Sequence, residues 1–279
     1  MIEISDFQPH TIPVSVIIPT FNASSTIERA LESVLLQISM PAQIIVVDDA
    51  SEDNTVEVLE KFCTAHSLLN IKKICLPKNV GPASARNVGW DNSTEEFIAF
   101  LDADDSWHPQ KLAIQYLWMK KNPGIVLSGH RCEFEPTAQA DVNLSESTSQ
   151  TSCSIQLFTL KSFILRNRLS TPTVMLRRDI QQRFLAGKRY SEDYLLWVEI
   201  IATHTNAGFI DLPLTRLYKN RYGASGLSGD LWKMQKGELD TLCRLYRASI
   251  IKLNKLSFLA LLTLSWMKFI KRFMICLLK

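Results

Sequence analysis

The chain has 279 residues, of which 46% are hydrophobic and 21% are charged, a balance that is typical of a folded globular protein and excludes extended disorder. Its six cysteines form no CxxC or CxxxC pair, so neither a zinc site nor a disulfide framework is predicted, and a reducing cytosol is the expected environment. The first 13 residues lack the basic start and apolar core of a signal peptide, so export is not expected.

The net charge of +3 hides an uneven distribution along the chain. Residues 1–240 carry a net charge of −5, since 23 of the 31 basic residues and all 28 acidic residues lie there. A near-neutral body with a basic C-terminal segment predicts an anionic surface as the partner of that segment, and argues against a nucleic acid bound along the body. The eight basic residues that follow Asp240 are Arg244, Arg247, Lys252, Lys255, Lys268, Lys271, Arg272 and Lys279.

The first 101 residues alternate apolar, β-branched segments with helical segments. The predicted strands are 14–19, 43–47, 71–76 and 97–101. Between them, residues 27–38 and 56–62 place apolar side chains at helical spacing, and residues 81–87 are predicted to open a short helix. This alternation predicts an α/β protein whose parallel sheet is covered by helices on both faces.

The second half of the chain gives weaker signals. A strand is predicted at 173–176, a helix at 192–204 and another strand at 208–212. Residues 136–154 are rich in Ser, Thr and Gln without periodicity, which predicts a long surface loop. Residues 218–228 are rich in Gly and Ser and contain basic side chains, which predicts a flexible segment able to close over a diphosphate.

The fourth predicted strand ends in three carboxylates within four residues, Asp102, Asp104 and Asp105. Buried carboxylates must be paired or bound to a cation, and hard oxygen ligands suit Mg²⁺ or Mn²⁺, which complete their coordination with water and phosphate oxygens. The segment therefore predicts a phosphorylated ligand. The alternative is an acidic turn that begins the next helix, which accounts for one or two of the acids but not for all three. Asp105 is the residue for which this capping role is expected.

Other polar side chains fall where the first two predicted strands end. Thr20 and Asn22 follow the first strand, and Asp48 and Asp49 follow the second. Parallel sheets bind their ligands at the carboxyl ends of the strands. All of these polar residues are therefore expected at one edge of the sheet, together with the acids after the fourth strand.

The order and spacing of these segments resemble a family 2 glycosyltransferase of the GT-A fold. The resemblance covers residues 14–115 closely, and the combination of its pieces makes it specific where any single piece would be weak. Further on, residues 191–194, followed by Trp197, resemble the acceptor-side Glu-Asp motif of this family. The matching segments of the first part are 14–22, positions 33 and 37, 46–55, 79–81, 85–87 and 100–105.

The resemblance implies a GT-A fold, with a Rossmann-like, mostly parallel central sheet, helices on both of its faces and a C-terminal helical extension. The implied catalytic domain spans residues 1–228, with the nucleotide-binding half at 14–115 and the acceptor half at 116–228. Residues 229–279 are expected to form C-terminal helices that end in a basic, amphipathic, membrane-associating tail.

The resemblance also assigns roles to single residues. It places Asp49 against the uracil of the donor and Arg86 on the nucleotide side of the site. Asp102 and Asp104 become the Asp-x-Asp pair, with Asp104 on Mn²⁺ or Mg²⁺ and Asp102 shared between the metal and the ribose and diphosphate. The remaining residues of the implied nucleotide pocket are Pro19, Thr20 and Asn22.

An inverting mechanism needs a general base that takes the proton of the acceptor hydroxyl on the face opposite the leaving group. Asp193 is the candidate base, and Glu192 is the second choice or a hydrogen-bonding partner. Both acids precede an apolar helix, so the alternative is that they cap its N-terminus. The upstream motifs favour the catalytic interpretation.

Residues 256–278 are apolar enough to suggest a membrane span, but Lys268, Lys271 and Arg272 lie in the middle of the segment. Its uninterrupted apolar part is shorter than the roughly 20 residues that a spanning helix requires. An amphipathic helix at 256–279, lying in the headgroup layer of an anionic membrane, is the favoured interpretation. The alternative is a terminal helix docked on the domain with its basic face in solvent.

The resemblance, together with the candidate carboxylates, implies an inverting, metal-dependent glycosyltransferase. It would move one sugar from a nucleotide-sugar, expected to be a UDP-sugar, to a lipid-linked saccharide in bacterial surface polysaccharide biosynthesis. The Gln-x-x-Arg-Trp motif of processive synthases is absent from the sequence, which favours one sugar per encounter. The expected location is the cytoplasm, peripheral on the inner face of the cell membrane.

Two other classes of function stay open at this stage. A nucleotidyltransferase also uses metal-bound carboxylates on a Rossmann-like sheet, but predicts a Gly-rich, basic phosphate loop after the first strand. Residues 20–23 read Thr-Phe-Asn-Ala instead. A catalytically inactive, membrane-associated scaffold is the second alternative, and the presence of all candidate carboxylates argues against it.

Overall fold

A computed structural model describes residues 10–134, 154–204, 206–218 and 229–277 of the chain. The first half of the chain contains β1 (Thr11–Thr20), α1 (Ile27–Leu35), β2 (Met40–Asp48), α2 (Thr55–Ala65), β3 (Ile71–Cys75), α3 (Pro82–Asp91), β4 (Phe97–Phe100), β5 (Ser106–Trp107), α4 (Lys111–Lys121) and β6 (Leu127–Phe134). The second half contains β7 (Ile155–Thr159), α5 (Leu160–Leu165), η2 (Thr171–Thr173), β8 (Met175–Arg177), α6 (Glu192–His204), β9 (Asn206–Leu217), α7 (Leu231–Arg247) and α8 (Lys255–Leu277).

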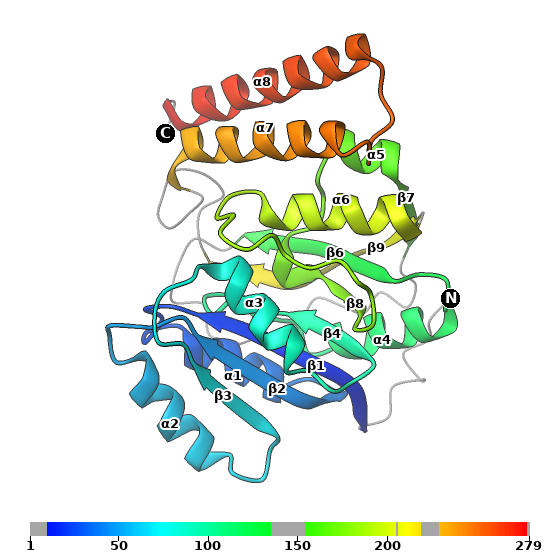
Figure 1. Ribbon diagram of the computed structural model, residues 1–279. Coiled ribbons are helices and arrows are strands. Elements are labelled where there is room, and N and C mark those ends of the chain that lie inside the picture. Colours follow the sequence, from blue (N-terminus) through cyan, green and yellow to red (C-terminus); the bar gives the residue numbers. More distant parts are fainter. Residues whose placement is uncertain (1–9, 135–153, 205, 219–228, 278–279) are drawn as a thin grey trace.

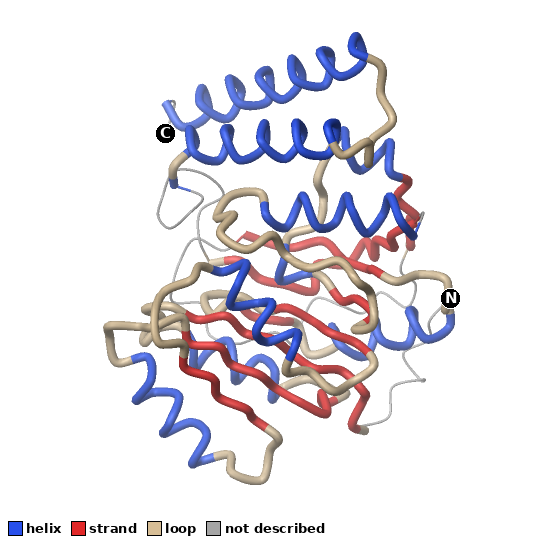
Figure 2. The backbone as a smooth tube through the Cα atoms, viewed as in Figure 1, coloured by secondary structure: helices blue, strands red, loops and turns tan. Residues whose placement is uncertain are grey.

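All of these strands belong to one sheet, whose order is β3-β2-β1-β4-β8-β6-β9-β5, with β7 paired to β9 (Figure 2). Strands β3, β2, β1 and β4 are parallel, as predicted for the nucleotide-binding half. Beyond them the sheet is mixed, because β8 runs antiparallel to both β4 and β6, whereas β6 and β9 are parallel. A strand pattern predicts that a segment is extended but not in which direction it pairs.

Helices cover both faces of the sheet, as predicted. Val14, Val16 and Ile18 of β1 pack in the core that also contains side chains of α1, α2 and α4. Ile17 belongs to the core on the other face, together with α3 and α6. Gly89 brings α3 so close to β1 that a Cβ at this position would lie 2.4 Å from Ile17 Cγ2. This close approach fixes the position of α3 on the sheet.

The last helices stack away from the sheet. Helix α7 packs on α6, and α8 packs on α7, as Figure 1 shows in orange and red. Asp230 begins α7, since its carboxylate accepts a hydrogen bond from the amide of Lys233 (2.9 Å). Helix α8 occupies the segment for which an amphipathic helix was predicted. The hydropathy and charge of the helices in the described ranges do not meet the requirements of a membrane-crossing helix.

Several expectations are corrected or lie outside the structure's described residues. Asp105 does not cap a helix, because β5 follows it and α4 begins only at Lys111, with Gln110 at the N-cap. The strand predicted at 173–176 is β8, which begins two residues later at Met175, because Thr173 ends the single turn η2. The loop predicted at 136–154 and the segment predicted at 218–228 fall almost entirely on residues outside the described ranges.

Candidate active site

The end of β1 lies at the predicted ligand-binding edge of the sheet. Thr20 is only 2% exposed, and its hydroxyl has no hydrogen-bond partner among the described residues. Pro19, before it, pairs with Val47 of β2. Because a buried hydroxyl without a partner is costly, this atom suits a hydrogen bond to a ligand.

Asn22 connects two loops of the candidate site through hydrogen bonds. Its backbone has a left-handed φ of 49°, a conformation that asparagine tolerates better than most residues. Its amide N–H donates to the Ser51 hydroxyl (2.9 Å), and its side-chain oxygen accepts from the amide of Glu52 (2.8 Å). The structure therefore shows a loop-positioning role for Asn22, and its predicted nucleotide contact stays a prediction.

Asp49 holds the loop that leads into α3. Its carboxylate accepts hydrogen bonds from the amides of Val80 (2.7 Å) and Gly81 (2.8 Å). Gly81 has a φ of 86°, which glycine adopts without strain, and it forms the N-cap of α3. Asp49 is 3% exposed. This structural role was not predicted, and the contact with uracil stays a prediction.

Arg86 lies at the centre of the candidate site and joins two distant carboxylates. Its guanidinium donates to Asp102 Oδ1 (2.8 Å) at the end of β4 and to Glu192 Oε1 (3.0 Å) at the start of α6. Arg86 and Glu192 are buried, with 5% and 8% of their surfaces exposed. Burial opposes the charged guanidinium, but the charges of Asp102 and Glu192 raise the pKa of Arg86 above its ordinary range. The guanidinium of Arg86 therefore joins Asp102, on the predicted nucleotide side of the site, to Glu192, on its predicted acceptor side.

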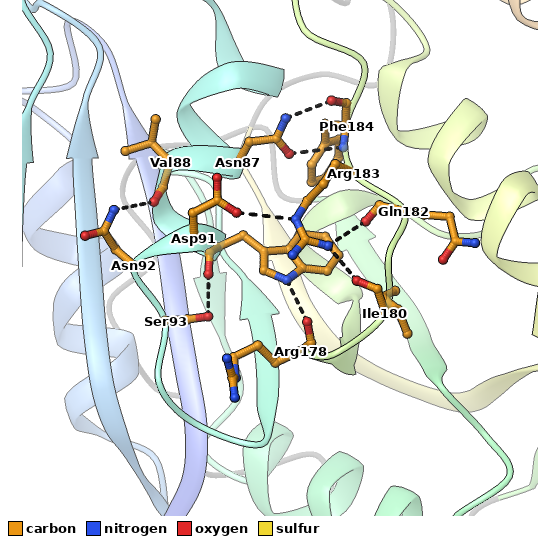
Figure 3. A network of polar contacts seen from close by, with 11 residues as sticks. Asn87, Val88, Asp91, Asn92, Ser93, Arg178, Ile180, Gln182, Arg183 and Phe184 are labelled. Atoms are coloured by element: carbon orange, nitrogen blue, oxygen red, sulfur yellow. Dashed lines mark hydrogen bonds and ion pairs between the residues drawn. The ribbon is translucent and has the colours of Figure 1, made fainter.

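Figure 3 shows a polar network between α3, which carries Arg86, and the segment 178–184. Asn87 exchanges two hydrogen bonds with the backbone of Phe184, at 2.8 and 3.1 Å. Arg183 donates to the carbonyl of Ile180 (2.6 Å), and its guanidinium lies 4.3 Å from the ring centroid of Trp90. These contacts hold the 180–184 segment on α3. They place the ring of Phe184 at 5.4 Å from the guanidinium carbon of Arg86.

Asp193 differs from its neighbour Glu192 in environment. Burial and the nearby charge of Glu192 raise the pKa of Asp193 to about 7, although its carboxylate accepts a hydrogen bond from the amide of Tyr194 (2.7 Å). Glu192 is held by Arg86 instead. A carboxyl group whose pKa lies near neutrality is suited to accept and release a proton, whereas an ion-paired carboxylate is not. The two acids therefore have different environments, and the choice of Asp193 as the base stays a prediction.

Arg29 is a site residue that the sequence analysis did not identify. Its guanidinium donates to the backbone carbonyl of Asp104 (2.7 Å) and lies 3.7 Å from the ring centroid of Tyr218. The Tyr218 hydroxyl in turn lies 3.1 Å from the hydroxyl of Ser106. These contacts fix the 102–105 loop against α1 and β9. Helices favour acidic rather than basic residues in their first turn. Arg29 lies two positions after Ile27, the first residue of α1, and this unfavourable position was the sequence signal that could have identified it.

Residues 15–182 match the family model described as Glycosyl transferase family 2. The chain belongs to this family. The Escherichia coli protein named UDP-Glc:alpha-D-GlcNAc-diphosphoundecaprenol beta-1,3-glucosyltransferase WfgD is 31% identical over 233 residues, which cover 82% of this chain and 85% of that protein. An uncharacterized glycosyltransferase of Rickettsia felis is 33% identical over 214 residues, 75% of this chain. The present glycosyltransferase spans only about a third of the length of that relative (33%).

Solved structures confirm the GT-A fold expected for this glycosyltransferase. S. aureus TarS in complex with UDP-GlcNAc aligns with a TM-score of 0.65 and 21% identity, over 90% of this chain and 70% of that one. The mannosyltransferase PcManGT from Pyrobaculum calidifontis, in complex with GDP-Man and Mn²⁺, aligns with a TM-score of 0.55 and 16% identity, over 96% and 89% of the two chains. At these identities the likeness is one of fold alone.

The carboxylates of this glycosyltransferase fit a substrate-completed metal site. In the described ranges, no group of three or more His, Cys, Asp or Glu side chains is placed to hold a metal ion. The 102–105 loop offers Asp104, which is partly exposed, and Asp102, whose side chain is 30% exposed and has one oxygen engaged by Arg86. A hard divalent cation that takes one or two protein carboxylates, and otherwise substrate oxygens and water, fits this donor set.

Proposed function

We propose that this glycosyltransferase is inverting and metal-dependent, and that it moves one sugar from a UDP-sugar to a lipid-linked saccharide. The observation that carries the proposal is the buried Arg86, which joins Asp102 at the nucleotide side to Glu192, next to Asp193. The name of one relative supports the substrates. WfgD, which is 31% identical, is named for a UDP-Glc donor and a diphosphoundecaprenol-linked acceptor.

The proposed roles follow from the contacts. Asp193 takes the proton of the acceptor hydroxyl as that oxygen attacks the sugar. Asp104 and Asp102 would hold Mn²⁺ or Mg²⁺, which neutralises negative charge on the departing diphosphate when bound. Arg86 keeps Asp102 in place on that side and neutralises Glu192, so that the proton-accepting role falls to Asp193 alone.

The nucleotide pocket is proposed to lie along the ends of β1 and β2. The buried Thr20 hydroxyl is the group best suited to a direct contact, because nothing in the described part of the chain satisfies it. Pro19, Asn22 and Asp49 shape the pocket around it, and Arg86 closes it on the side of β4.

The setting is proposed to be the synthesis of a bacterial surface polysaccharide, at the inner face of the cell membrane. A polyprenyl-linked acceptor such as that in the name of WfgD is confined to a membrane, so its transferase must work at the lipid surface. The alternative of nucleotidyl transfer gains no support from family membership. The alternative of an inactive scaffold is decided by the assay below.

The test is a screen of UDP-sugars with Mn²⁺ and lipid-linked acceptors, read by mass spectrometry of the released UDP and the product. Replacing Asp193 by Asn is expected to lower kcat by about 10²–10⁴-fold while UDP affinity is kept. The exposed Asp179, replaced by Asn, is the matched control and should leave kcat unchanged. The proposal fails if no UDP-sugar is turned over, or if the two variants behave alike.

A further inference from the structure

The side of α8 that packs on the protein combines apolar and polar contacts. Leu261 is only 7% exposed, and the ring of Phe258 stacks on Tyr246 of α7 with 4.0 Å between the centroids. The hydroxyl of Ser265, only 1% exposed, donates to Glu238 Oε1 of α7 (2.9 Å) and accepts from the side-chain amide of Gln235 (3.0 Å). Arg272 forms an ion pair with the other oxygen of Glu238 (3.2 Å), and Lys268 donates to the carbonyl of Leu165 (2.6 Å). The alternative of a docked helix whose basic face lies in solvent is therefore wrong for these two basic residues.

The opposite side of α8, here called the apolar face, is exposed. Each of its large side chains has between 47% and 78% of its surface accessible. Trp266, 39% exposed, extends this face toward Trp232 of α7, which is 51% exposed, with 5.9 Å between the ring centroids. A contiguous apolar patch of this kind on a protein surface marks an interaction site. The members of the apolar face are Leu256, Leu259, Met267, Ile270, Phe273 and Met274.

Charge decides which partner this face suits. At 100° per residue, the exposed Lys255 and Lys271 lie at opposite borders of the apolar face. No acidic residue follows Asp240 in the chain, whereas eight basic residues do. Two copies that met through this face would bring like charges together without compensation. An anionic lipid surface supplies both the apolar layer and the opposite charge.

We propose that the apolar face of α8, extended by Trp232 and Trp266, inserts into the interface of an anionic bilayer. Helix α8 then lies in the membrane plane, and α7 lies between it and the catalytic domain. The sequence predicted a membrane-associating tail, and the structure adds which face enters the lipid and how the opposite face is held. The biological purpose of this insertion rests on the proposed lipid-linked acceptor. The insertion itself does not, since vesicle binding does not require turnover.

The tryptophan fluorescence of the chain can report this insertion. Of its six tryptophans, Trp90, Trp107, Trp118 and Trp197 are at most 7% exposed, whereas Trp232 and Trp266 are open to solvent. Vesicles of phosphatidylcholine and phosphatidylglycerol with brominated acyl chains should therefore quench the fluorescence of the full chain. The quenching should disappear when Trp232 and Trp266 are both replaced by Phe. No quenching of the parent chain, with binding unaffected, would overturn the proposed insertion.

Matched variants test the apolar face itself. Replacing Leu259, Met267 and Ile270 together by Gln should weaken partitioning onto the anionic vesicles by about a hundredfold or more. These side chains are 58%, 63% and 57% exposed, so the fold should be kept. The control replaces three exposed leucines elsewhere by Gln and should partition like the parent. The control positions are Leu36, Leu68 and Leu157, which are 52%, 99% and 56% exposed.

The charge argument has its own variant. Replacing Lys255 and Lys271 by Gln should weaken binding to the anionic vesicles by about fivefold for each lysine and leave binding to pure phosphatidylcholine unchanged. The proposal is overturned if the triple Gln variant binds vesicles like the parent. It is also overturned if sedimentation shows a dimer that this variant dissociates while the parent binds no lipid. Turnover of a short-chain, water-soluble acceptor separates these failures from a failure of the proposed function.

Discussion

Replacing Asp193 by Asn is expected to stabilise the protein while it removes activity. The pKa of Asp193 is raised from its ordinary value of 3.8 to about 7 by burial and by the charge of Glu192. A carboxylate that is harder to ionise in the folded chain than in the unfolded chain destabilises the folded state at neutral pH. Asn has no charge to bury, and its side-chain oxygen can still accept the hydrogen bond from the Tyr194 amide.

The sign and size of this effect follow from linkage. Below a pH of about 4 both states of the parent hold the proton, so parent and variant should have similar stability. As the pH rises from about 4 to about 7, the parent loses stability that the variant keeps, and above about 7 the difference stays constant. A difference of about three pH units corresponds to at most about 4 kcal/mol. Because Asp193 is partly exposed, solvent screening reduces the expected gain to about 1–3 kcal/mol at pH 8.

Urea unfolding of both proteins at pH 4.5 and at pH 8 measures this difference. The free energy of unfolding of the variant should exceed that of the parent at pH 8 and approach it at the lower pH. The exposed Asp179, replaced by Asn, should change stability by less than about 0.5 kcal/mol at either pH. A variant that is less stable than the parent at pH 8, or a gain that does not depend on pH, would refute the assignment of a destabilised carboxylate to this position.

Three further predictions concern the residues around the site. Replacing Arg86 by Met leaves Glu192 buried without its partner, so the free energy of unfolding in urea should fall by about 3–5 kcal/mol. The same change at the exposed Arg178 is the control and should lower it by less than about 0.5 kcal/mol. Replacing Arg29 by Gln removes the hydrogen bond that holds the 102–105 loop, so Mn²⁺ should bind roughly tenfold more weakly in the presence of UDP. The electron paramagnetic resonance of free Mn²⁺ measures this binding, and the variant Arg29→Lys should restore part of the lost affinity. Replacing Gly237 by Ala puts a Cβ at 2.5 Å from Tyr190 Cβ, so the free energy of unfolding should fall by about 1–3 kcal/mol, and kcat should fall with it. The control is Gly124→Ala, whose new Cβ has no atom within 4 Å, and it should change neither quantity. Equal effects in a variant and its control, or unchanged Mn²⁺ binding, would contradict the corresponding assignment.

The fold of residues 14–115 was predictable because its signals are local. The apolar runs that become β1, β2 and β4 each end in polar residues, and parallel strands bring those ends to one edge. The pairing of Arg86 was not predictable in the same way, since its partners lie 16 and 106 residues away along the chain. The antiparallel position of β8 was missed for a similar reason, because the direction of pairing depends on contacts between distant segments.

The C-terminal helix shows a different limit of sequence analysis. The sequence predicted an amphipathic helix in this segment, and in α8 Ser265, Lys268 and Arg272 lie on the side that also buries Leu261. The sequence did not reveal which side would face the protein, because that depends on Glu238 of α7, which lies 27 residues before Ser265.

Helix α7 connects this surface to the candidate base. Ser191, two residues before Asp193, has a left-handed φ of 55°, a strained conformation for a residue other than glycine. The Thr241 hydroxyl of α7 donates to the Ser191 carbonyl (3.3 Å), and Glu238 of the same helix anchors α8. Packed helices, rather than a flexible linker, therefore separate the proposed lipid-facing surface from Asp193. In the proposed orientation, a saccharide whose lipid stays in the bilayer would reach Asp193 at a distance from the membrane that the packing of α6, α7 and α8 sets.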